Sequence, residues 1–189
     1  MSVNYVGNDY DYPINKNYTS SLMFPWLRWT YGTFEMRAAL PMGQSIKIGT
    51  YLGPVSAREW ALSGQITFMD YNQKDQMIVS QVTYGKPVIN SIIHVNMSES
   101  KVDRFNVYKL VWTETELNFF VNDNQTLMFP LNQTLQQNNN YKKLGEPFDK
   151  PFYFGLSVQI NEGAGAYHKD IYKQWNCSAL IVDYMRCYS

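Results

Sequence analysis

One ten-residue stretch sets the fold class of this chain: it reads YGTFEMRAAL and covers residues 31–40. From Phe34 to Leu40 the apolar side chains fall on every second position, and polar side chains occupy the positions between them up to Arg37. Because a strand points successive side chains to opposite faces, this period of two predicts a half-buried β-strand. A Pro-Met-Gly turn at residues 41–43 ends the stretch.

The same period of two recurs along most of the chain. We expect further strands over residues 46–52, 64–71, 77–84, 88–95, 105–112, 116–121, 125–129, 152–160 and 179–188. No segment shows a convincing helical repeat, and the polar stretch NQTLQQNNNYKK at residues 132–143 is expected to be an exposed loop. Short strands joined by turns predict an all-β fold, built as an antiparallel β-sandwich or barrel.

Composition narrows the classes of partner. The chain has 189 residues, of which 45% are apolar, 16% aromatic and 17% charged, and its 16 basic and 16 acidic residues cancel. A zero net charge argues against a nucleic-acid partner and against attraction to anionic membranes. No apolar run reaches the roughly 20 residues that span a bilayer, so we expect no membrane insertion. We expect residues 1–20 to be a polar lead-in and residues 21–189 to be a single β-sandwich domain.

Glycosylation acceptors point to the secretory pathway. The pattern N-x-[ST] occurs at Asn17, Asn96, Asn124, Asn132 and Asn176. Chance placement would produce about two such triplets in a chain of this composition. We therefore expect a secreted, extracellular glycoprotein.

The two cysteines, Cys177 and Cys187, leave two interpretations open. In a secreted chain the pair predicts one disulfide that closes a short C-terminal loop. On a continuous strand, however, ten residues span roughly 30 Å, which is too far to bridge. The disulfide therefore requires a turn near Ala179, and the alternative is two buried, reduced thiols.

Residues 59–71, which read EWALSGQITFMDY, carry a resemblance to a known family. They resemble glycoside hydrolase family 16, in its laminarinase and β-1,3-glucan-recognition-protein branch, whose pattern is a Trp, then Ser-Gly, then Glu-x-Asp-x-x-Glu on one strand. Other blocks of that family follow in family order, at residues 31–38, 82–85, 105–113, 117–123, 147–153 and 182–188. The resemblance implies a jelly-roll, concanavalin-like β-sandwich with a sugar-binding concave face.

The resemblance also assigns the positions of the catalytic groups. Gln65 stands at the nucleophile position, Thr67 at that of the assisting Asp, Asp70 at that of the acid/base and Thr83 at that of a nearby His. Position i+5 shares the face of i and i+2 only if a bulge adds one residue. Because a carboxamide cannot act as the glycosyl nucleophile, we expect a pseudoenzyme that lacks catalytic residues. Without the resemblance, residues 65–70 are an ordinary half-buried strand.

The leading hypothesis is a non-catalytic protein that binds β-1,3-glucan, with a polysaccharide or oligosaccharide as its partner. Sugar rings stack on aromatic side chains, so the expected carbohydrate-binding residues are Trp60, Gln65, Asp70, Tyr84, Tyr51 and Trp175. One alternative is a structural or assembly protein that uses the sandwich for protein–protein contacts. The other is a weakly active hydrolase that uses Asp70 with a second carboxylate.

No metal site or cofactor is expected from the residues themselves, because the two histidines lack partners at ligand spacing. The resemblance allows one exception. Members of the family often hold a structural calcium with the Asp of the C-terminal strand as a ligand, and Asp183 matches that position.

Overall fold

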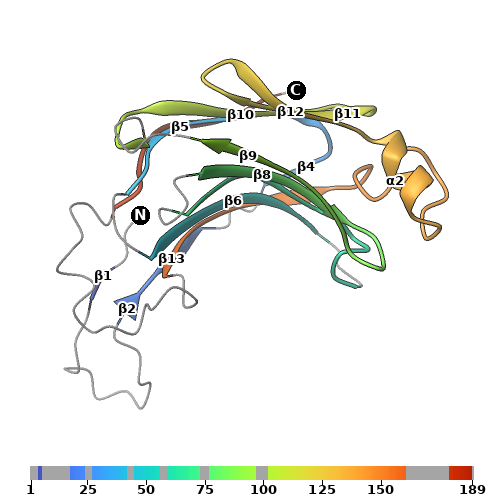
Figure 1. The fold of residues 1–189 in the computed structure, drawn as a ribbon, viewed down its shortest axis with the longest axis horizontal. Coiled ribbons are helices and arrows are strands. Elements are labelled where there is room, and N and C mark those ends of the chain that lie inside the picture. The colour runs from blue at the N-terminus through green and yellow to red at the C-terminus, as the bar shows by residue number, and fades with distance from the viewer. Residues whose placement is uncertain are drawn as a thin grey trace, which may run out of the picture.

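The computed structural model describes residues 4–5, 18–23, 27–41, 45–55, 59–72, 77–96, 102–160 and 179–188. Most of these residues belong to antiparallel strands, and nearly all the strands form two large sheets (Figure 1). The prediction of an all-β, antiparallel β-sandwich is confirmed. No helix in the described ranges is both long and apolar enough to cross a membrane.

The first sheet has five strands in the order β12-β11-β10-β5-β14. The strands are β5 (Gly32–Ala39), β10 (Asn106–Trp112), β11 (Glu116–Val121), β12 (Asn124–Pro130) and β14 (Ile181–Tyr188). The stretch that opened the sequence analysis is its fourth strand, and all its pairings are antiparallel. The inner face of β5 is fully buried at Phe34, Met36 and Ala38.

The second sheet has seven strands, six in the order β3-β13-β6-β7-β8-β9, with β4 paired to β13 beside β3. The strands are β3 (Ser21–Met23), β4 (Arg28–Trp29), β6 (Ile46–Pro54), β7 (Gln65–Asn72), β8 (Met77–Tyr84), β9 (Ile89–Asn96) and β13 (Phe152–Ile160). In Figure 1 the two sheets bow in the same sense, so the outer face of the seven-stranded sheet is concave. A further small pair, β1 (Asn4–Tyr5) with β2 (Tyr18–Thr19), lies within the expected lead-in.

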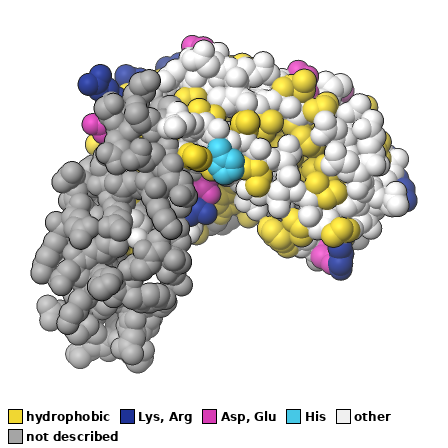
Figure 2. Space-filling model, viewed as in Figure 1, with side chains coloured by type: hydrophobic (Ala, Val, Ile, Leu, Met, Phe, Trp, Pro, Cys, Tyr) yellow, Lys and Arg dark blue, Asp and Glu magenta, His cyan; other side chains and the backbone are white. Residues whose placement is uncertain are grey.

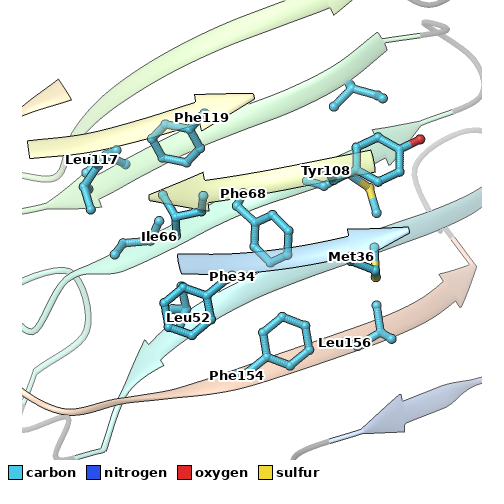
Figure 3. Close-up of a cluster of buried hydrophobic side chains, with 14 of the residues drawn as sticks. Phe34, Met36, Leu52, Ile66, Phe68, Tyr108, Leu117, Phe119, Phe154 and Leu156 are labelled. Carbon is cyan, nitrogen blue, oxygen red and sulfur yellow. The ribbon is translucent and has the colours of Figure 1, made fainter. Parts of the chain in front are cut away.

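The core lies between the two sheets. Figure 3 shows side chains from both sheets pointing into one layer, among them Phe34 and Phe119 from the five-stranded sheet and Phe68 and Phe154 from the other. The ring centroids of Phe68 on β7 and Phe154 on β13 are 5.9 Å apart, so side chains from the two strands that flank β6 pack together in this layer. The inner face of each strand thus supplies the apolar residue that the period of two predicted.

One segment differs from expectation. Residues Asn132–Gln137 form the short helix α2, where an exposed loop was expected. The helix begins directly after the buried Leu131, and Thr134 in its first turn is buried as well. The Asn/Gln-rich composition concealed these two anchors, which fix the segment against the sandwich. Tyr141, in the same stretch, is only 8% exposed.

Candidate functional site on the concave face

The candidate site is the concave face of the seven-stranded sheet, and strand β7 crosses its middle. Gln65 and Thr67 lie on this face, while Ile66 and Phe68 between and after them are buried in the core. The register shifts between Thr67 and Asp70 against β8, which means that the strand bulges there. The bulge adds the residue that returns Asp70 to the concave face, as the i, i+2, i+5 spacing required.

Asp70 forms the charged centre of this face. Its carboxylate lies 3.0 Å from the Nζ of Lys47 on β6. Gly49, which pairs directly with Asp70, has no side chain to stand between them. Burial raises the pKa of Asp70, and the neighbouring ammonium of Lys47 opposes this rise. Among the described residues of the concave face Asp70 is the only carboxylate, and its side chain is largely buried.

Neutral hydrogen-bonding side chains on β8 and β9 lie next to β7 on this face. The Nε2 of Gln81 donates to the Oγ1 of Thr83 at 2.8 Å and to the Oδ1 of Asn90 at 2.9 Å, and the Thr83 hydroxyl donates to the same Oδ1. Gln65 lies opposite Thr83 in the register, so the first position of the motif borders this network. Amides and hydroxyls in a row offer donors and acceptors to sugar hydroxyl groups without charge.

An aromatic pocket of about 270 Å³ lies on this face at the Gln65 end of β7, away from Asp70. Its lining includes Tyr51, Trp60 and Tyr153, together with Gln65 and Gly53. Trp60 is 67% exposed, so its ring is available for stacking. The two tyrosine rings pack edge to face with their centroids 6.5 Å apart.

Glycines hold these two tyrosines against the sheet. A Cβ on Gly155 would lie 2.6 Å from the ring of Tyr51, and one on Gly53 would lie 2.9 Å from the ring of Tyr153. Each ring therefore covers the bare backbone of the neighbouring strand. Tyr153 was not among the expected sugar-binding residues, although alternation alone places it on the outer face, between the buried Phe152 and Phe154.

The structure brings three of the six expected sugar-binding residues together, because Tyr51, Trp60 and Gln65 line one pocket. Asp70 shares their face but lies further along β7. The prediction that Tyr84 binds sugar was wrong: the side chain is fully buried, and its hydroxyl donates to the Oε1 of Gln137 at 2.6 Å. It follows Thr83 in a strand whose inner face carries the core, so it is closed to a sugar ring. Trp175 lies outside the described residues.

Some of the expected glycosylation and disulfide residues lie within the described residues and others lie outside them. Asn96, Asn124 and Asn132 are exposed, whereas Asn17 and Asn176 lie outside the described residues. Cys187 is a half-buried free thiol on β14, and burial raises its pKa to about 11. Its proposed partner Cys177 lies outside the described residues, so the structure gives the disulfide no support.

The described residues do not fit the calcium ion that the resemblance allowed. The carboxylate of Asp183 forms an ion pair with the guanidinium of Arg37 on β5, so a cation already occupies it. In the described ranges no three His, Cys, Asp or Glu side chains gather where they could hold a metal ion. A calcium site at Asp183 would require Arg37 to leave this ion pair.

Comparisons with known proteins point to glucan-degrading enzymes. No family model matches the chain. A β-glucanase of Rhodothermus marinus is 26% identical over 170 residues, which cover 85% of this chain and 58% of the relative. A glucan endo-1,3-β-glucosidase of Cryptopygus antarcticus is 26% identical over 156 residues, which cover 77% of this chain and 56% of the relative. The chain thus spans just over half the length of these curated relatives.

Solved glucanase structures share the fold of this chain. The laminarinase of Rhodothermus marinus superposes with a TM-score of 0.78 at 22% identity, over 100% of this chain and 76% of that one. A non-specific endo-β-1,3(4)-glucanase from family 16 superposes with a TM-score of 0.73 at 23% identity, over 92% of this chain and 66% of that one. The chain has the family 16 glucanase fold. The family 16 resemblance is therefore confirmed at the level of the fold.

These findings correct one prediction. We expected a protein that is not an enzyme, but the two curated relatives carry the names of glucan-hydrolysing enzymes. The prediction rested on four altered positions, Gln65, Thr67, Asp70 and Thr83, and it treated these changes as the loss of the whole site. The comparisons do not favour the alternative of a structural or assembly protein either.

Proposed function

We propose that the protein binds a β-1,3-glucan chain along the concave face of its seven-stranded sheet and hydrolyses it. One observation carries the proposal: an aromatic pocket at Tyr51, Trp60 and Tyr153 opens on the same face as the partly buried carboxyl group of Asp70. The names of the relatives supply the substrate class. Figure 2 shows the sandwich from the same side as Figure 1, and uncharged side chains dominate the described surface in that view.

Binding begins at the pocket. The rings of Trp60 and the two tyrosines offer apolar faces on which a glucose ring stacks. Gln65 at the pocket wall, and the Gln81–Thr83–Asn90 network beyond it, supply hydrogen bonds to hydroxyl groups of the same chain. Because these groups carry no charge, a neutral polysaccharide that binds them does not have to strip water from a charged side chain.

Asp70 is the proton donor in this proposal. Burial raises its pKa, and a carboxyl group with a raised pKa is suited to general-acid chemistry. It donates its proton to the glycosidic oxygen, which leaves as a hydroxyl group while the oxygen of water bonds to the anomeric carbon. The surplus proton of that water passes to the solvent, from which Asp70 is protonated again.

Calorimetry with laminarihexaose tests the binding half. Trp60→Ala should weaken binding about tenfold, because a stacked ring is lost. Tyr188→Ala is the matched control, since Tyr188 is 52% exposed and lies on β14 of the other sheet. Equal affinity for wild type and Trp60→Ala would show that the pocket is not the glucan site.

Release of reducing ends from laminarin tests the hydrolytic half. Asp70→Asn should abolish the release, whereas Asp123→Asn should leave it unchanged. Asp123 also pairs with a lysine, Lys109 at 2.7 Å, but it is exposed and lies in the turn between β11 and β12 of the other sheet. If the wild type releases no reducing ends, or Asp70→Asn releases as many as the wild type, hydrolysis by Asp70 is refuted and binding stands on the calorimetry alone.

A further inference from the structure

We infer that Tyr141 is a positioning residue for Trp60, and that the segment after α2 thereby controls the glucan pocket from behind. Neither the motif strand nor the resemblance to family 16 points to this residue. The inference rests on the proposed function only where it predicts affinity for glucan. The structural link itself is independent of any ligand.

Trp60 lies on a tight turn that its own backbone only partly holds. The amide of Ser63 donates to the carbonyl of Glu59 at 3.3 Å, and the amide of Gly64 donates to that of Ala61 at 3.1 Å. Both Ala61 and Gly64 have positive φ, at 70° and 75°. A turn with an alanine in the left-handed region persists only when its surroundings hold it.

Tyr141 provides that hold through a single hydroxyl group. The hydroxyl donates to the carbonyl of Leu62, inside the turn, at 3.2 Å. It also accepts the amide of Gly85 at 2.7 Å, and the same amide is 2.9 Å from the carbonyl of Ala61. One buried oxygen therefore joins the Trp60 turn to the end of β8. Burial raises the pKa of Tyr141 to about 12, so the hydroxyl keeps the proton that it donates.

The segment that carries Tyr141 is itself fastened to the same place. The Nδ2 of Asn140 donates to the carbonyl of Lys86 at 3.1 Å, and the ammonium of Lys86 forms an ion pair with Glu59 at the start of the turn. Gly85 lets Asn138 approach, because a Cβ at that glycine would lie 2.2 Å from its Nδ2. The turn, the end of β8 and the segment after α2 thus form one connected unit.

Tyr141→Phe tests the link, because it removes only the hydroxyl and keeps the ring in the core. Tyr84→Phe is the matched control: its hydroxyl is buried nearby and bonds to Gln137, but it does not touch the turn. The protein is labelled with 5-fluorotryptophan, and the fluorine resonance of Trp60 is assigned with Trp60→Phe. Its resonance should shift in Tyr141→Phe and stay in place in Tyr84→Phe, while the resonance of the buried Trp112 stays in place in both.

Affinity for laminarihexaose provides the second readout. Tyr141→Phe should bind about tenfold more weakly than wild type, since the loss of one buried hydrogen bond frees the turn, and Tyr84→Phe should bind as wild type does. An unchanged Trp60 resonance in Tyr141→Phe would overturn the inference. If wild type binds no glucan but the resonance shifts, the proposed function fails and the positioning role of Tyr141 stands.

Discussion

Replacing Gly155 with alanine places a methyl group beneath the ring of Tyr51. The new Cβ would lie 2.6 Å from the Cζ of that ring and 2.9 Å from its hydroxyl oxygen. Carbon atoms in contact stay about 3.6 Å apart, so the ring must rise by about 1 Å into the pocket. The clash falls on the far end of a side chain rather than on the backbone, so the ring and not the strand has to shift.

The substitution should therefore weaken glucan binding more than it lowers the stability of the fold. We expect the free energy of unfolding to fall by about 1 kcal/mol, the low end for overpacking. The affinity for laminarihexaose should fall about tenfold, because the raised ring narrows the space that a sugar would fill. Calorimetry measures the affinity, and chemical denaturation measures the free energy of unfolding.

A double-mutant cycle isolates the cause. In a Tyr51→Ala background no ring remains above residue 155, so Gly155→Ala should weaken binding no further. If Gly155→Ala lowers affinity equally in both backgrounds, the ring of Tyr51 does not transmit the effect. Wild-type affinity in the single Gly155→Ala variant would show that Tyr51 does not contact the glucan.

Four further predictions concern the charge of Asp70, the pH dependence of stability, bound metal and glycans. Lys47→Met removes the ammonium that opposes the rise in the pKa of Asp70, so the basic limb of the pH profile for laminarin hydrolysis should move to higher pH; an unchanged limb would exclude Asp70 as the titrating acid. The same carboxyl, whose pKa is raised on folding, binds more protons in the folded state, so stability should fall as the pH rises from 3.8 through the raised pKa, and Asp70→Asn should flatten this slope in denaturation measured across that range. EDTA should leave Tm unchanged because Arg37 already pairs with Asp183, and a loss of several degrees would reveal a structural metal. Expression through a eukaryotic secretory pathway should attach glycans at the three exposed acceptor asparagines, and treatment with an N-glycosidase that leaves the mass unchanged would contradict this.

Local patterns predicted the strands well, since their information lies in neighbouring residues. The alternation in residues 31–40 became β5, with Phe34, Met36 and Ala38 on the core side. The spacing from Gln65 to Asp70 required a bulge, and β7 has its irregularity in that interval. Both results follow from the two-residue period of a strand, which any fold that buries one face must respect.

Patterns of composition misled where burial depended on distant segments. Tyr84 looked like a stacking residue because it lies within the motif block at residues 82–85, yet packing against Phe129 and Phe148 places it in the core. The Asn/Gln-rich stretch looked like a loop, yet it contributes α2 and the buried Tyr141. In both cases the partners lie more than forty residues away in the chain.

The amino-acid sequence by itself determined which side chains share a face and which chemistry each can perform: an amide at Gln65, a carboxyl at Asp70, a stacking ring at Trp60. Only the tertiary structure decided which of them meet. It placed Tyr153 beside Tyr51, Lys47 against Asp70 and Tyr141 behind the Trp60 turn. The physical reason is that alternation is a local property of the backbone, whereas the register between strands and the burial of a hydroxyl depend on segments that meet only when both sheets are complete.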